Sequence, residues 1–94
     1  MDTLTRVREI YPDMELLYTD GIDGLSGEPS DGKVETYILK RNNVIYVTPR
    51  LCHRPDGKWM VRPESLGNKK ENWTSFKVET LDEALDILRK GKNG

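Results

Sequence analysis

The chain has 94 residues, of which 35% are apolar and 33% charged, and its formal net charge is −1 at pH 7. This length suits one domain, and so few apolar side chains predict a thin core without a deep substrate cavity. The sequence lacks an apolar run of the ~18–20 residues that a membrane span needs, and its start does not resemble a signal peptide. A single cysteine, Cys52, excludes an internal disulfide and a multi-cysteine zinc or iron–sulfur site. We therefore expect one soluble, cytoplasmic domain over residues 1–94, with no membrane partner.

The small net charge conceals an uneven distribution of charge along the chain. Residues 1–39 carry a balance of −6, residues 40–77 a balance of +6, and residues 78–94 a balance of −1. The middle block alone resembles a polyanion-binding segment. Whether the acidic block lies beside it in the fold is left open by the sequence.

The first half of the chain predicts a helix, a strand and a long loop. Leu4, Val7 and Tyr11 share one helical face, and Pro12 ends that helix. The apolar run 14–19 suits a strand, whereas the glycine- and aspartate-rich segment 20–32 predicts a flexible loop.

The second half alternates strand-like runs with turn signals. Runs 35–40 and 44–51 flank the hairpin signal Arg41-Asn42-Asn43, and Arg54-Pro55-Asp56-Gly57 predicts a second turn. Strands at 58–62 and 73–79 follow, joined by a polar tip at 66–72. Thr80-Leu81-Asp82-Glu83 is a capping box, and the helix it begins is expected to end at Gly91. The order predicts an α+β domain, a single antiparallel sheet of about four or five strands with a short N-terminal and a longer C-terminal helix packed on one face.

Alternation along the strands predicts which side chains face the helices. The expected inward set is Ile45, Val47, Leu51, Trp59, Val61, Phe76 and Val78, with Leu85 and Leu88 packing on it. Thr48 and Met60 are expected to face outward. The same outward face is expected to collect Tyr46, Arg50, Lys58, Arg62 and Lys77.

The sequence gives little support for an enzymatic function. Cys52 and His53 are neighbours on a strand, so their side chains point to opposite faces and do not suit a catalytic dyad. With one histidine there is no Ser-His-Asp triad or multi-histidine metal site, and the acidic loop lacks the calcium-loop spacing. We expect a non-enzymatic domain with no cofactor, no metal and no evident small-molecule substrate.

Two binding functions are left open. The leading hypothesis is a nucleic-acid-binding module, because phosphates are attracted to basic sheet faces with interleaved aromatic rings. Its expected contact residues are Tyr46, Arg50, Lys58, Arg62, Lys69, Lys70, Trp73 and Lys77. The alternative is a protein–protein interaction module, an adaptor or small inhibitor of the kind that phages and mobile elements encode. It would use a strand edge, Trp73 or the acidic loop.

Residues 44–90 are also similar in layout to the three-stranded-sheet-plus-helix DNA-binding domains of plant ethylene-response factors and phage-type integrases. The resemblance rests on Gly57-Lys58-Trp59-Met60-Val61, a basic turn, Phe76, and the helix start at Thr80. The chain departs from that family where Val78 replaces an aromatic residue two positions before the threonine. The resemblance implies a sheet that enters the DNA major groove and contacts it through outward basic side chains.

Overall fold

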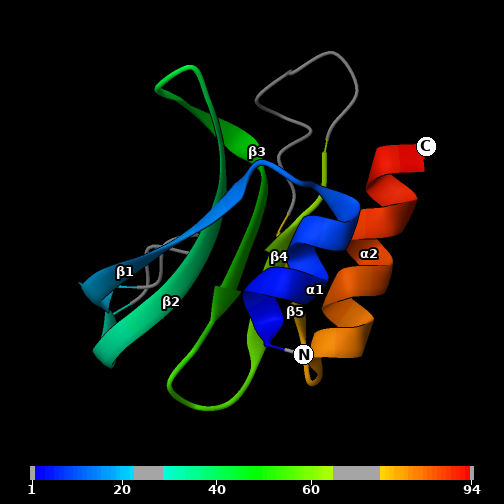
Figure 1. The fold of residues 1–94 in the computed structure, drawn as a ribbon. Helices are drawn as coiled ribbons and strands as arrows, with labels where there is room; N and C mark the ends of the chain where they lie inside the picture. The colour runs from blue at the N-terminus through cyan, green and yellow to red at the C-terminus, as the bar shows by residue number, and fades with distance from the viewer. Residues whose placement is uncertain (1, 23–28, 65–74, 94) are drawn as a thin grey trace.

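The protein is a five-stranded antiparallel sheet with two helices, an α+β fold as predicted (Figure 1). The computed structural model describes residues 2–22, 29–64 and 75–93. The strands lie in the sheet in chain order, β1-β2-β3-β4-β5. The elements are α1 (Thr3–Ile10), β1 (Met14–Ile22), β2 (Pro29–Arg41), β3 (Val44–His53), β4 (Trp59–Arg62), β5 (Phe76–Val78) and α2 (Leu81–Asn93).

Both helices pack on one face of the sheet, side by side, and close the main core (Figure 1). Leu85 and Leu88 of α2 are fully buried in one cluster with Trp59 and Val61, as the two periodicities predict. Val7 and Ile10 bring α1 into the same cluster. Neither helix in the described part of the chain is long and apolar enough to span a bilayer.

Local signals account for the two helix starts. The Asp2 side chain accepts a hydrogen bond from the Thr5 amide at 2.8 Å and caps α1. At α2 the Glu83 amide donates to the Thr80 hydroxyl at 3.2 Å, and that hydroxyl donates to the Glu83 carboxylate at 3.1 Å. The predicted capping box is therefore present, although the glutamate meets the threonine side chain rather than its backbone amide.

The expected end of α2 at Gly91 is wrong. The helix continues through Gly91 to Asn93. A Cβ atom at position 91 would lie 2.7 Å from the Cβ of Pro63 and 3.2 Å from the Glu64 nitrogen. Glycine is needed here because the helix approaches the end of β4 closely.

Both predicted turns are confirmed. Asn42 and Asn43 both have positive φ, 52° and 65°, as the tight turn between β2 and β3 requires. In the second turn the Gly57 amide donates to the Arg54 carbonyl at 3.0 Å, and Gly57 has a φ of 88°.

The strands around the expected loop are longer than predicted. Residues 20–22 belong to β1 and residues 29–32 to β2, and Ile22 pairs with Pro29. The expected loop at 20–32 is therefore wrong at both of its ends, and its middle is residues 23–28. Those residues, like the expected tip at 66–72, lie outside the described residues.

The predicted alternation fails in the first half of β3. Ile45 and Val47 are exposed and Thr48 is buried, the reverse of the expectation. The cause is a register shift: Ile38 pairs with Arg50, but Lys40 pairs with Ile45, so β3 holds three more residues than β2 over this stretch. An odd insertion reverses which face each side chain meets.

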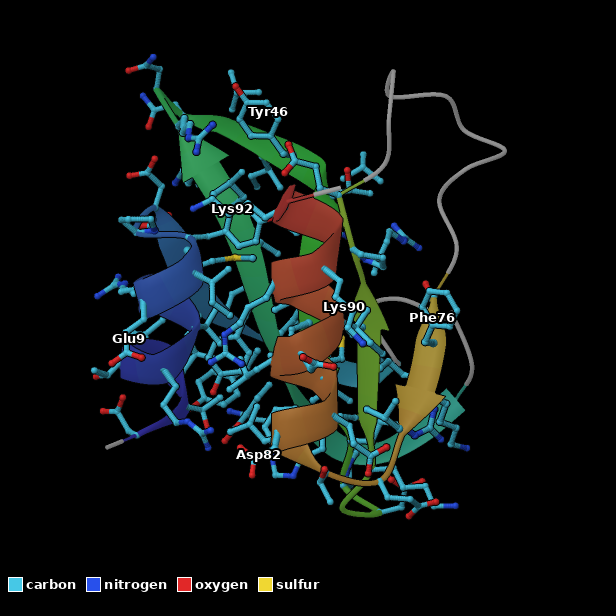
Figure 2. All side chains as sticks on the ribbon, turned by 90° about the vertical axis from the view of Figure 1, so that its right-hand side faces the viewer. Glu9, Tyr46, Phe76, Asp82, Lys90 and Lys92 are labelled. Atoms are coloured by element: carbon cyan, nitrogen blue, oxygen red, sulfur yellow. The ribbon has the colours of Figure 1, made fainter. Side chains whose placement is uncertain are left out.

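Side chains on the sheet face opposite the helices are also buried. Met60, expected to face outward, is only 8% exposed and packs with Cys52 and Val34. Thr36 belongs to the same layer, with its hydroxyl 3.4 Å from the Cys52 sulfur. Conversely Phe76, expected in the core, is 44% exposed because it lies on β5, the outer strand (Figure 2).

Candidate interaction surface on strand β3

The most exposed apolar stretch of the described chain lies at the start of β3, just after the β2–β3 turn. Val44, Ile45, Tyr46 and Val47 are between 36% and 54% exposed. This end of the hairpin extends past the helices, and Tyr46 lies at the end of the sheet nearest the C-terminal end of α2 (Figures 1 and 2). Four consecutive exposed apolar residues form a patch, which is a more informative feature than a single exposed leucine or valine.

Only one side of the same stretch is paired with a strand among the described residues. On one side β3 pairs with β2, through Val44 with Arg41 and Ile45 with Lys40. On its other side β4 pairs only with Arg50–His53, so no strand among residues 2–22, 29–64 and 75–93 continues alongside 44–47. We call residues Val44–Val47 the β3 edge. Unpaired amide and carbonyl groups on a strand are a template for pairing with another extended chain.

Two arginines adjoin the β3 edge. Arg50 and Arg62 are direct partners across the β3–β4 ladder, so their side chains share the face opposite the helices. The Arg50 Nη2 donates to the Tyr46 carbonyl at 3.2 Å, which places the guanidinium beside the β3 edge. Its Nε is buried and has no hydrogen-bond partner among the residues that the structure describes.

The positive charge of Arg50 affects the pKa of Arg62. Burial, followed by the neighbouring charge of Arg50, lowers the pKa of the Arg62 guanidinium. Arg62 is partly buried and its Nε donates to the Ser75 hydroxyl at 3.3 Å. The pair therefore concentrates positive charge on a partly buried part of the sheet.

Of the remaining predicted contact residues, the structure describes Lys77, Lys58 and Tyr46. Lys77 is exposed and pairs in register with Met60, so it lies on the same face as the arginines. Lys58 lies 3.7 Å from the Glu79 carboxylate, which offsets its charge. Tyr46 is exposed, with the Arg41 guanidinium 6.0 Å from its ring centre. Lys69, Lys70 and Trp73 lie outside the described residues.

The two residues weighed as a catalytic pair are separated by the sheet. Cys52 is buried against Met60 on one face, whereas the His53 ring stacks on Trp59 at 3.9 Å on the other. His53 also lies 3.4 Å from the Glu35 carboxylate. In the part of the chain that the structure describes, no three histidine, cysteine or acidic residues are grouped to hold a metal ion.

Sequence reasoning missed the β3 edge as a site. It assigned Ile45 and Val47 to the core because alternation was extended through the whole run 44–52. A signal was present nonetheless: Val44-Ile45-Tyr46-Val47 is a run of four apolar residues, which does not alternate.

The chain shows no detectable relation to known proteins in three comparisons. No family model matches it, and neither the curated proteins nor the solved structures contain a significant match. The similarity of residues 44–90 to the sheet-plus-helix DNA-binding domains stays a prediction, and in the structure β3–β5 and α2 form part of a five-stranded sheet.

Proposed function

We propose that the protein is a small interaction module that binds an extended segment of another protein along the β3 edge. The observation that carries the proposal is the coincidence, at Val44–Val47, of an exposed apolar run with a strand edge that no described strand pairs on the β4 side. In strand addition, main-chain hydrogen bonds supply affinity and pockets for alternate side chains supply specificity. The β3 edge offers both kinds of contact.

Folded proteins usually protect such an edge. Short edge strands, charged side chains and prolines keep unpaired strands from joining other chains. The outer strand β5 follows that rule with only three residues, and Lys77 is at its centre. Residues 44–47 have no charged side chain at all. The lack of charge on residues 44–47, in contrast to Lys77 on β5, supports a binding role for the β3 edge.

Nucleic-acid binding is the second candidate, and one observation favours it. Arg50, Arg62 and Lys77 share the sheet face opposite the helices. A phosphate backbone is bound by several accessible charges in a row, however, and here Lys58 lies beside Glu79 while Arg62 is partly buried. The exposed surface next to Arg50 is apolar, which suits a protein segment better than a phosphate backbone.

A display library of random short peptides tests the proposal. Peptides enriched on the wild-type protein should bind a triple variant, Val44→Thr with Ile45→Thr and Val47→Thr, on the order of ten-fold more weakly, because methyl groups buried on binding are lost. Threonine keeps the β-branched shape that suits a strand, so the variant should fold.

Phe76→Thr is the matched control, because Phe76 is also exposed but lies on β5. Equal loss of binding in both variants, or no enriched peptide, contradicts the proposal. Generic duplex and single-stranded nucleic acids are titrated in parallel at low salt. Binding below about 100 μM, with salt-dependent weakening and no peptide enrichment, would favour the second candidate.

A further inference from the structure

We infer that the Arg50 guanidinium binds a carboxylate of the docked segment, so that the partner is an extended peptide with an acidic residue beside its apolar ones. This inference rests on the proposed strand docking at the β3 edge and adds the chemistry of the partner to it. Arg50 would then bind one side chain of the segment, while the β3 edge would form hydrogen bonds with the backbone of the segment.

The position of Arg50 supports this role. Its Nη2 donates to the carbonyl of Tyr46, a member of the β3 edge, so the guanidinium lies against the backbone to which a docked segment would bind. Within residues 2–22, 29–64 and 75–93, its buried Nε has no hydrogen-bond partner. A buried donor without a partner is unfavourable, and a carboxylate is the acceptor that best matches the planar donor set of arginine.

The charges around Arg50 also favour an anionic group in the partner. Arg62 lies directly opposite Arg50, and like charges in that arrangement repel. In the described part of the chain, no carboxylate forms an ion pair with Arg50 within 4.0 Å, although Arg41, Arg54 and Lys58 each have one. A carboxylate arriving with the partner would offset the repulsion between the two guanidinium groups.

The charges beside the β3 edge favour one kind of binding partner. Lys40 pairs with Ile45, so an exposed basic residue adjoins the β3 edge from β2 while Arg50 adjoins it from β3; the charge of Arg41 is offset by Asp13. A second copy of the chain docked edge to edge would bring the same basic flanks together. An acidic segment meets opposite charge instead, which favours a different protein as the partner.

The experiment is a double-mutant cycle between the protein and the peptides enriched from the display library. Each enriched acidic peptide is compared with its glutamine or asparagine counterpart on wild-type protein, Arg50→Gln and Arg50→Lys. We expect the acidic form to bind wild type about ten-fold more tightly, and the preference to vanish in Arg50→Gln. Arg50→Lys keeps the charge but lacks the planar fork, so it should retain only part of the preference.

Arg89→Gln is the matched control. It removes one positive charge from an exposed position on α2, the helix that packs on the other face of the sheet, and should leave the preference intact. Thermal unfolding of each variant establishes that it is folded.

The outcomes separate this inference from the proposed function. Enriched peptides that bind the β3 edge equally well with acid or amide overturn the carboxylate role and leave strand docking in place. An acid preference that survives Arg50→Gln and Arg50→Lys also overturns it. The absence of any enriched peptide overturns both. Nucleic-acid binding that depends on Arg50, without peptide binding, would assign the guanidinium to phosphate instead.

Discussion

Arg50 and Arg62 face each other across the β3–β4 ladder, and Arg50 reaches back along its own strand to the carbonyl of Tyr46. Two like charges placed as direct partners, one with a buried donor lacking a partner, destabilise the folded chain. Residues that reduce stability in this way are characteristic of binding sites, where the missing contact comes from the ligand. The pair therefore links the basic face predicted from sequence to the apolar β3 edge found in the structure.

Replacement of Arg50 by methionine should make the protein more stable. The variant loses the 3.2 Å hydrogen bond to Tyr46 but removes the repulsion from Arg62 and the buried Nε. We expect a gain of about 1 kcal/mol in the free energy of unfolding, from the range for like-charged cross-strand pairs and unsatisfied donors. Urea unfolding measures it, with Arg50→Lys as the control that keeps the repulsion. A loss of stability in Arg50→Met would show that the arginine is structural.

Leu85→Ala and Ile45→Ala should differ sharply in stability. Leu85 is fully buried on the side of α2 that faces the sheet, so its truncation should lower the free energy of unfolding by about 2–5 kcal/mol. Ile45 is 52% exposed, and its truncation should change that energy by less than about 0.5 kcal/mol. Thermal denaturation of the two variants checks both values. Comparable losses would mean that Ile45 belongs to the core, as alternation alone predicted.

Local sequence signals predicted most of the fold. The capping residue Asp2, the paired asparagines at 42 and 43, and the box at Thr80 each determine the backbone within a few residues, so the sequence predicts them. The register shift between Ile38 and Lys40 is different, because it arises from the pairing of two strands and inverts the faces of Ile45 and Val47. Met60 was misassigned for another reason: the alternation argument assumes one buried face, and this sheet buries side chains on both.

Gly91→Ala should be destabilising even though alanine is the better helix former. Alanine is favoured over glycine within a helix by about 1 kcal/mol. Its Cβ would lie 2.7 Å from the Pro63 Cβ, however, and proline is too rigid to move aside cheaply. Overpacking of this kind costs about 1–3 kcal/mol, so we expect a net loss in thermal stability. A rise in melting temperature would show that α2 and Pro63 can separate.

The turn at Asp56 should make stability dependent on pH in the acid range. The hydrogen bond from the Lys58 amide, at 2.9 Å, lowers the pKa of the Asp56 carboxyl below its usual 3.8, and Arg54 adds to the effect. Because the folded pKa is the lower one, this stabilisation is present above the unfolded pKa and lost as pH falls through the folded pKa.

The comparison is with Asp56→Asn, which keeps an acceptor oxygen but cannot ionise. Wild type should be the more stable protein near neutral pH, and the difference in melting temperature should shrink as pH falls below about 4. A difference that stays constant across this range would contradict the assignment.

The candidate site was only partly predictable. Alternation in the second half of β3 and in β4 correctly placed Arg50 and Arg62 on one face, because that part of the β3–β4 ladder is regular. It could not show that Lys58 lies beside Glu79, since this contact depends on the pairing of β4 with β5. Nor could it show the unpaired edge at 44–47, because the extent of β4 beside β3 is a property of the assembled sheet.

Amide hydrogen exchange at residues 44–47, with and without an enriched peptide, tests strand docking at the β3 edge most directly. Those amides of the β3 edge that are not bonded to β2 should exchange quickly in the unbound protein and become protected on binding, since a docked strand accepts their hydrogen bonds. The amides of Phe76–Val78 on the outer strand β5 provide the internal reference and should not change. Protection that appears at β5 or β1 while residues 44–47 remain unchanged would contradict the account.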